Sequence, residues 1–94
     1  MTQKIRLHPG EILKILYMEP LNLTVTKLAE TIKKDRSGVS ELINGKRSIS
    51  ADTAWRLSIA FDTTAQYWMN LQSSYDLWIT EKNKRPEIKT LVTS

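Results

Sequence analysis

The chain has 94 residues, no cysteine, and a net charge of +4 from 14 Lys and Arg against 10 Asp and Glu. This length suits a single domain, and the lack of cysteine excludes disulfides and thiolate metal sites. The apolar runs are far shorter than the roughly 18 residues that span a bilayer, and residues 1–10 lack the apolar core of a signal peptide. We therefore expect a cytoplasmic protein with no membrane partner, whose basic charge is compatible with nucleic acid.

The apolar residues recur at helical spacing in five short segments, so we expect an all-α bundle. The first segment begins at His8, with Pro9 in the first helical position, where its missing N–H would have had no partner. Pro20 marks the end of this segment. Its apolar residues are Ile12, Leu13, Leu16 and Tyr17.

Only a few residues separate the second segment from the third. Thr24 is the expected N-cap of the second helix, and Asp35 that of the third. The third helix should end at Asn44 and Gly45, since glycine readily takes the left-handed conformation of a helix end. The apolar side of the second helix consists of Leu28, Ala29 and Ile32.

The fourth segment opens at Ser50 or Asp52 and runs to Phe61, and the fifth spans about residues 64–81. The residues beyond the fifth are charged and then mildly apolar. We expect a domain of residues 1–85 followed by a flexible or partner-dependent tail, residues 86–94. One stripe of the fifth segment carries Tyr67, Trp68, Leu71, Tyr75 and Trp78.

Residues 35–44 form the segment that says most about function. On a helical wheel at about 100° per residue, Val39, Leu42 and Ile43 share one face. The opposite face carries mostly small polar groups, so this helix can approach another surface closely. Two short helices joined by so tight a turn predict a helix-turn-helix unit, whose second helix enters the major groove of DNA.

This hypothesis gives the polar side chains two kinds of contact. Those on the outward face would read base edges, where Arg to guanine is the commonest pairing. Cations at the two ends of the helix would meet phosphates, and uncharged groups would add further backbone contacts. The expected base-reading residues are Arg36, Ser37, Ser40 and Glu41. The expected backbone contacts are Thr24, Lys33, Lys34, Asn44, Lys46 and Arg47.

Four stretches carry a resemblance to a known family: HPGEIL (8–13), LAETI (28–32), VSELINGKRSISADTAWRLS (39–58) and YWMNLQSSYDLW (67–78). They resemble the HigA/VapI family of addiction-module antitoxins, within the lambda-repressor-like helix-turn-helix group. The resemblance covers residues 6–80 and implies a five-helix lambda-repressor-like fold that reads DNA with residues 35–44. It also implies a homodimer on a palindromic operator, which represses its own operon and neutralises a co-encoded, ribosome-dependent mRNA endonuclease.

Two places depart from the family's pattern. Val25 stands where many relatives have a glutamine that contacts phosphate. Lys33 and Lys34 stand where the turn usually has glycine and an apolar residue, and a lysine in a left-handed conformation is strained. We therefore expect a longer or reshaped turn, whose added positive charge offsets the missing glutamine.

No catalytic site, metal site or cofactor is expected. His8 is the only histidine, so it lacks the partners of a zinc site, and we assign it to helix entry. Catalysis would need an activated nucleophile or a convergent acid–base pair. The serines have no histidine partner, and the acids are scattered among basic residues.

The fifth helix is more apolar than one small core requires. A second copy of the chain would cover the excess, so we expect a homodimer. The residues expected at the dimer contact are Trp68, Leu71, Tyr75 and Trp78.

Two alternative functions stay open. One is a module that holds a toxin and has little specific DNA binding, with residues 87–92 adding to a partner's sheet edge or the first helix docking in a groove. The other is a solitary transcriptional regulator that shares the DNA chemistry and has no toxin. Only the gene neighbourhood separates this regulator from an antitoxin.

Overall fold

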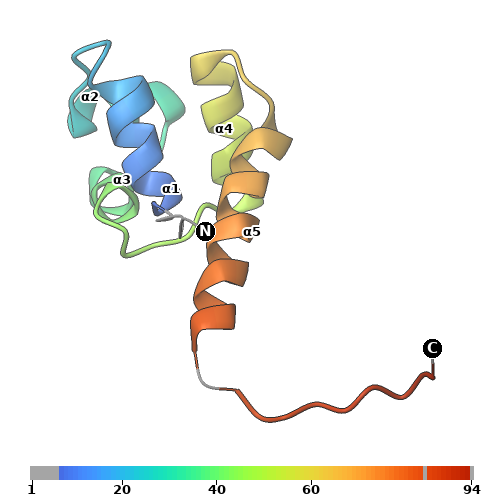
Figure 1. The fold of residues 1–94 in the computed structure, drawn as a ribbon. Coiled ribbons are helices and arrows are strands. Elements are labelled where there is room, and N and C mark those ends of the chain that lie inside the picture. The colour runs from blue at the N-terminus through green and yellow to red at the C-terminus, as the bar shows by residue number, and fades with distance from the viewer. Residues whose placement is uncertain (1–6, 84, 94) are drawn as a thin grey trace.

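The structure is a computed structural model that describes residues 7–83 and 85–93. Its elements contain no strand in these ranges: α1 (Pro9–Ile12), the π-helical η1 (Leu13–Met18), α2 (Val25–Ile32), α3 (Arg36–Ile43), α4 (Ala51–Phe61) and α5 (Ala65–Lys82) (Figure 1). The expected all-α, five-helix fold is confirmed. Residues 1–6 and 84 of the expected domain and Ser94 of the expected tail lie outside the described residues.

Short polar side chains cap three of the helices at starts that the sequence indicated. Thr24, Ser50 and Thr64 each accept a hydrogen bond from the backbone N–H three residues further on, at 3.0, 3.2 and 3.0 Å. Each bond satisfies one of the N–H groups that the start of a helix leaves unpaired. Of the two candidate starts for α4, the structure therefore selects Ser50.

The first helix differs from its expected form. From Leu13 onward its backbone is π-helical, and Glu19 N donates to Lys14 O, five residues back, at 2.9 Å. The wider turn puts Leu13 and Met18, also five residues apart, into the core together. Leu16, which α-helical spacing placed on the apolar side, is instead 59% exposed.

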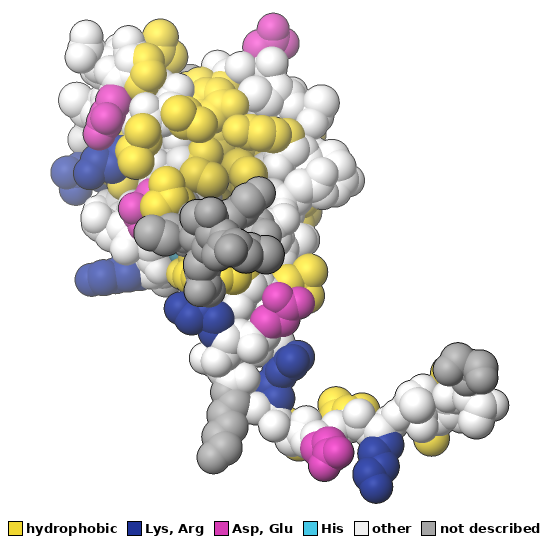
Figure 2. Space-filling view, viewed as in Figure 1, with side chains coloured by type: hydrophobic (Ala, Val, Ile, Leu, Met, Phe, Trp, Pro, Cys, Tyr) yellow, Lys and Arg dark blue, Asp and Glu magenta, His cyan; other side chains and the backbone are white. Residues whose placement is uncertain are grey.

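The helices pack around one core. α4 and α5 lie side by side, α1 contacts α3 and α5, and α2 contacts α3 and α4 (Figure 1). Trp68 of α5 is fully buried, with its ring centroid 5.0 Å from that of Tyr17 and 5.1 Å from that of Tyr67. Apolar side chains also gather at the surface over the space between η1 and α4, on the face seen in Figure 2. The remaining apolar core consists of Leu13, Met18, Leu28, Ala29, Ile32, Val39, Leu42, Ile43, Ile49, Ala54 and Leu57.

α5 extends beyond the other helices, and residues 85–93 run away from the bundle without regular secondary structure (Figure 1). Ile88, Leu91 and Val92 of this segment are fully exposed or nearly so. Its expected role as a flexible or partner-dependent tail stays a prediction. In the described ranges, none of the helices has the length and apolar character needed to cross a membrane.

Candidate nucleic-acid interface

α2 and α3 form a helix-turn-helix unit, with only Lys33, Lys34 and Asp35 between them. Lys33 takes the left-handed conformation (φ 59°, ψ 47°), and Lys34 N donates to Ala29 O at 3.0 Å, which closes α2. Asp35 caps α3 by accepting a hydrogen bond from Gly38 N at 3.1 Å. The turn is therefore not lengthened: it keeps its short form and bears the strain at Lys33.

Side chains of α4 hold this turn in place through hydrogen bonds and an ion pair. Arg56 Nη1 donates to the carbonyl oxygens of Ile32 at 2.8 Å and Lys33 at 3.1 Å. Arg56 Nε donates to Asp52 at 3.0 Å, and the same carboxylate pairs with Lys34 at 2.8 Å. Hydrogen bonds from Lys34 and Arg56 lower the pKa of Asp52. Lys34, expected at the DNA backbone, faces α4 and would reach a phosphate only by leaving Asp52.

α3 buries one face and exposes the other, as its pattern predicts. Its buried residues include Leu42, whose carbonyl oxygen lies directly against Gly10 of α1. A Cβ at Gly10 would overlap that oxygen, so only glycine lets α1 pack this closely on α3. Ser40 is half-buried. The exposed polar residues of α3 and its C-cap are Arg36, Ser37, Glu41 and Asn44.

Local hydrogen bonds organise the outward face of α3. Arg36 Nε donates to Thr26 Oγ1 at 2.9 Å, which sets the first turn of α3 beside the first turn of α2. At the other end, Arg47 donates to one oxygen of Glu41 through Nη2 at 2.7 Å and Nε at 3.1 Å. These bonds raise the pKa of Arg47. Exposed pairs of this kind contribute little to stability, so they can be exchanged for DNA contacts at small cost.

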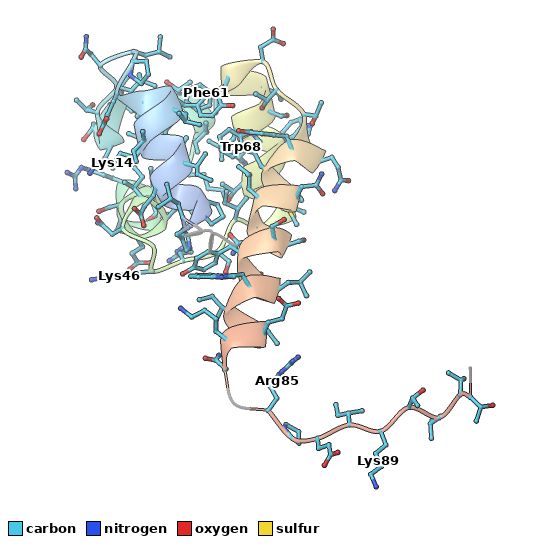
Figure 3. The ribbon with its side chains drawn as sticks, viewed as in Figure 1. Lys14, Lys46, Phe61, Trp68, Arg85 and Lys89 are labelled. Carbon is cyan, nitrogen blue, oxygen red and sulfur yellow. The ribbon has the colours of Figure 1, made fainter. Side chains whose placement is uncertain are left out.

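The loop between α3 and α4 adds cations at the C-terminal end of α3. Gly45 has a φ of 76°, and Lys46 N donates to Glu41 O at 2.8 Å, which ends the helix. The Lys46 side chain points away from the bundle (Figure 3). Lys46, Lys33 and Arg36 form no ion pair with any residue that the structure describes. Free positive charge therefore borders the outward face of α3 at both ends.

The structure thus places the expected DNA-contacting residues at the start of α2, in the turn between α2 and α3, on α3 and its C-cap, and in the loop that follows α3. The Thr24 hydroxyl is engaged as the cap of α2, so it would contact a phosphate through its remaining lone pair or O–H. The actual contacts of these residues with DNA stay predictions. The gathered residues are Thr24, Lys33, Lys34, Arg36, Ser37, Ser40, Glu41, Asn44, Lys46 and Arg47.

One of the four residues expected at a dimer contact was placed wrongly. Trp68 is fully buried inside a single chain, because Tyr17 and Tyr67 pack against its ring and its N–H donates to Thr63 Oγ1 at 2.7 Å. A second copy cannot reach it. The other three expected contacts, Leu71, Tyr75 and Trp78, are half-buried.

Three residues that support this surface were not identified from the sequence. Gly10 has the signature of a helix start, and nothing in the sequence reveals what packs on it. Arg56 has the appearance of an ordinary exposed helix cation. Gln72 lies four residues after Trp68 on the apolar stripe of α5. This position was the available signal, because a polar residue on an apolar stripe is expected to be buried and a buried polar group needs a hydrogen-bond partner.

Known proteins share this arrangement. Residues 15–68, more than half of the chain, match the model of the helix-turn-helix family. The chain belongs to the helix-turn-helix family. It is 46% identical to the uncharacterised HTH-type transcriptional regulator YbaQ of Escherichia coli, over 84% of this chain and 70% of that protein. It is 36% identical to antitoxin HigA-1 of Vibrio cholerae, over 94% of this chain and 83% of that protein.

A solved structure extends the likeness to three dimensions. Pseudomonas aeruginosa antitoxin HigA with the higBA promoter matches at 41% identity and a TM-score of 0.79, over 81% of this chain and 83% of that one. The resemblance to HigA antitoxins and the lambda-repressor-like helix-turn-helix fold are therefore confirmed. Family membership also confirms that the chain is not an enzyme.

Proposed function

We propose that the chain is a sequence-specific DNA-binding antitoxin of a type II toxin–antitoxin module, which represses its own operon. The observation that carries the proposal is the outward face of α3, where short polar groups and Arg36 lie between the exposed cations Lys33 and Lys46. The Pseudomonas HigA structure, described with the higBA promoter, supports it. An operator partner would place the protein in the cytoplasm.

In the proposed complex, α3 lies in the major groove with its first turn at the base edges. Arg36 exchanges its bond to Thr26 for a bidentate contact with a guanine. Arg47 leaves Glu41 for a phosphate, and the freed carboxylate accepts from a cytosine amino group. The hydroxyls of Ser37 and Ser40 supply the remaining groups that can donate or accept.

Phosphate contacts flank the reading face. Lys33 and Lys46 meet the backbone on either side, and each phosphate that they neutralise releases counterions, so affinity falls as salt rises. Thr24 and Asn44 add uncharged contacts that fix the position of α3. Lys34 contributes only if it leaves its ion pair with α4.

The proposed repressor is a homodimer on a palindromic operator. Two copies of α3 about 34 Å apart would match half-sites separated by one helical turn of DNA. The half-buried Leu71, Tyr75 and Trp78, with Leu77 exposed beside them, give α5 an apolar surface that a second copy can cover. Sedimentation at micromolar concentration should show a dimer, and a monomer alone would contradict this contact.

The proposed protein partner is a co-encoded mRNA-endonuclease toxin. The similarity to antitoxin HigA-1 supports this assignment, and the exposed Ile88, Leu91 and Val92 offer a partner an apolar segment. Co-expression with an untagged product of the neighbouring gene should yield a complex. Deletion of residues 86–94 then tests whether the tail contributes to it.

A solitary transcriptional regulator is the second candidate, and the 46% identity to the E. coli HTH-type regulator favours it. Operator binding without co-purification of any neighbouring product would select this function. Co-purification without specific DNA binding would instead select a module that only holds a toxin. A reporter gene under the protein's own upstream DNA tests autorepression: expression of the protein should lower the reporter signal, and Arg36→Ala should restore it.

A further inference from the structure

Gln72 of α5 is one of two buried polar side chains in the described part of the chain, at 4% exposure. Its amide oxygen accepts a hydrogen bond from Ile49 N at 2.8 Å, and its amide nitrogen donates to Asp76 Oδ1 at 2.9 Å. An ionised carboxylate can only accept, so Asp76 fixes the direction of the amide and turns its oxygen toward Ile49. Without Gln72, the buried N–H of Ile49 would have no partner, which is unfavourable.

Ile49 lies near the end of the loop of residues 44–50, which carries the cations that follow α3. Its own side chain is buried and anchors that end of the loop. The beginning of the loop, Gly45, lies against His8: a Cβ added to Gly45 would be 3.7 Å from the ring. The His8 ring in turn packs edge-on against Tyr75 of α5, with centroids 5.0 Å apart. α5 therefore supports this loop at both ends.

We propose that Gln72 is a positioning residue for DNA binding. It holds Ile49, and with it the loop, where Lys46 and Arg47 meet the phosphate backbone, and it touches no DNA itself. The proposal rests on the proposed function and adds a route of regulation to it. α5 also carries the proposed dimer contact. If dimerisation shifts α5, the loop held by Gln72 moves with it, and so do its phosphate contacts.

The substitution Gln72→Glu disrupts both hydrogen bonds of the side chain. It keeps an acceptor for Ile49 N but removes the donor and sets a second carboxylate against Asp76, so the side chain turns away and frees the loop. We expect operator affinity to fall about tenfold, the equivalent of one hydrogen bond. The slope of log affinity against log salt should also fall by about one phosphate contact, and the uncharged Gln72→Met should show the same fall, which excludes the added negative charge of Gln72→Glu as its cause.

Two further variants serve as rescue and control. Asp76→Asn added to Gln72→Glu supplies an amide donor to the new carboxylate, and affinity and salt slope should return to within about threefold of wild type. Asp76→Asn alone still offers Gln72 an acceptor and measures the effect of losing the carboxylate by itself, against which the double variant is compared. Gln72→Met, similar in volume but without either hydrogen bond, should reproduce the loss and replaces Gln72→Glu if the latter fails to fold by circular dichroism.

The proposal is overturned if folded Gln72→Glu or Gln72→Met binds the operator with wild-type affinity and salt slope. A Gln72→Glu/Asp76→Asn double variant that stays folded but does not recover overturns it as well. If wild type itself shows no preference for operator, the proposed function fails instead. Amide hydrogen exchange at Ile49, slow in wild type and faster in Gln72→Met, then still decides whether Gln72 holds the loop, and equal exchange would refute that hold.

Discussion

Arg56 on α4 donates a 2.8 Å hydrogen bond to the carbonyl oxygen of Ile32, the last residue of α2. The end of a helix leaves carbonyl oxygens without partners inside the helix, and a cation there also meets the negative end of the helix dipole. A residue of α4, the second helix after α2, thus completes α2 at the point where the chain turns toward α3. The helix-turn-helix unit is therefore held in place by α4 as well as by its own turn.

Arg56→Ala should lower the free energy of unfolding by about 1–2 kcal/mol, because it removes a charged hydrogen-bond donor from two carbonyls of the turn. Urea denaturation measures this change. Lys14→Ala is the matched control, since it removes an exposed cation that has no ion pair with the described residues. Equal stability of the two variants would show that Arg56 does not support the turn.

Lys33→Gly should have opposite effects on stability and on DNA binding. Glycine relieves the left-handed strain and should raise the free energy of unfolding by about 0.5–1 kcal/mol. Loss of the cation should weaken operator binding and reduce the salt slope by about one. Asp62→Gly is the control, because Asp62 is also left-handed (φ 54°) but ends α4 and is not among the residues expected at DNA. It should gain stability without any change in DNA binding.

Two glycines should respond differently to alanine. Gly10→Ala places a Cβ against the Leu42 carbonyl oxygen, so α1 and α3 must separate, at a cost of about 2 kcal/mol in folding stability. At Gly38 the Cβ would lie 3.3 Å from the Asp35 carboxylate, a side chain that can shift. Gly38→Ala also gains helix propensity, so its stability should stay close to wild type or rise slightly. Thermal unfolding of both variants gives the comparison, and equal stabilities would disprove the close packing at Gly10.

Stability should depend on pH through His8. The ring is buried and accepts a hydrogen bond from Gly10 N through Nδ1 at 2.9 Å, and burial lowers the pKa of His8 below 6.5. The unfolded chain then takes up the proton more readily than the folded chain. The stability linked to His8 is therefore full above pH 6.5 and is lost as pH falls through the folded pKa. Urea denaturation across this range should show the loss, and His8→Asn, a cap that does not titrate, should lack it.

Arg36 and Lys46 should affect DNA binding in different ways. Arg36→Ala should cost about 1–3 kcal/mol of operator affinity and relax the sequence preference at one base pair. Lys46→Ala should weaken binding to all sequences alike and reduce the salt slope by about one. Titrations against operators substituted one base pair at a time distinguish the two patterns. Unchanged affinity and preference in Arg36→Ala would show that α3 docks differently.

Features set by neighbouring residues could be predicted from the sequence. The caps at Thr24 and Asp35 depend on short polar side chains that bond within the first turn of their own helix. The buried and exposed faces of α3 follow from apolar spacing. The approximate helix boundaries and the polar character of the outward face of α3 could therefore be predicted without a structure.

Features set by distant residues were not predictable. Arg56 contacts Ile32 and Gln72 contacts Ile49 only because the fold brings separate helices and loops together. The dimer assignment of Trp68 failed for the same reason, since no sequence pattern shows that Tyr17 from η1 covers this ring. The exposure of Leu16 follows from π-helical geometry, which the α-helical period does not anticipate.

The most direct test of the central claim is fluorescence anisotropy of the wild-type protein on two duplexes, one from immediately upstream of its own gene and one scrambled. We predict that it binds the upstream duplex about 10³-fold more tightly than the scrambled one at about 0.15 M salt, as specific DNA-binding proteins commonly do. Equal affinity for both duplexes with a steep salt dependence would mean that the cations around α3 only attract the phosphate backbone. That result would contradict a sequence-reading α3 and leave toxin binding as the leading function.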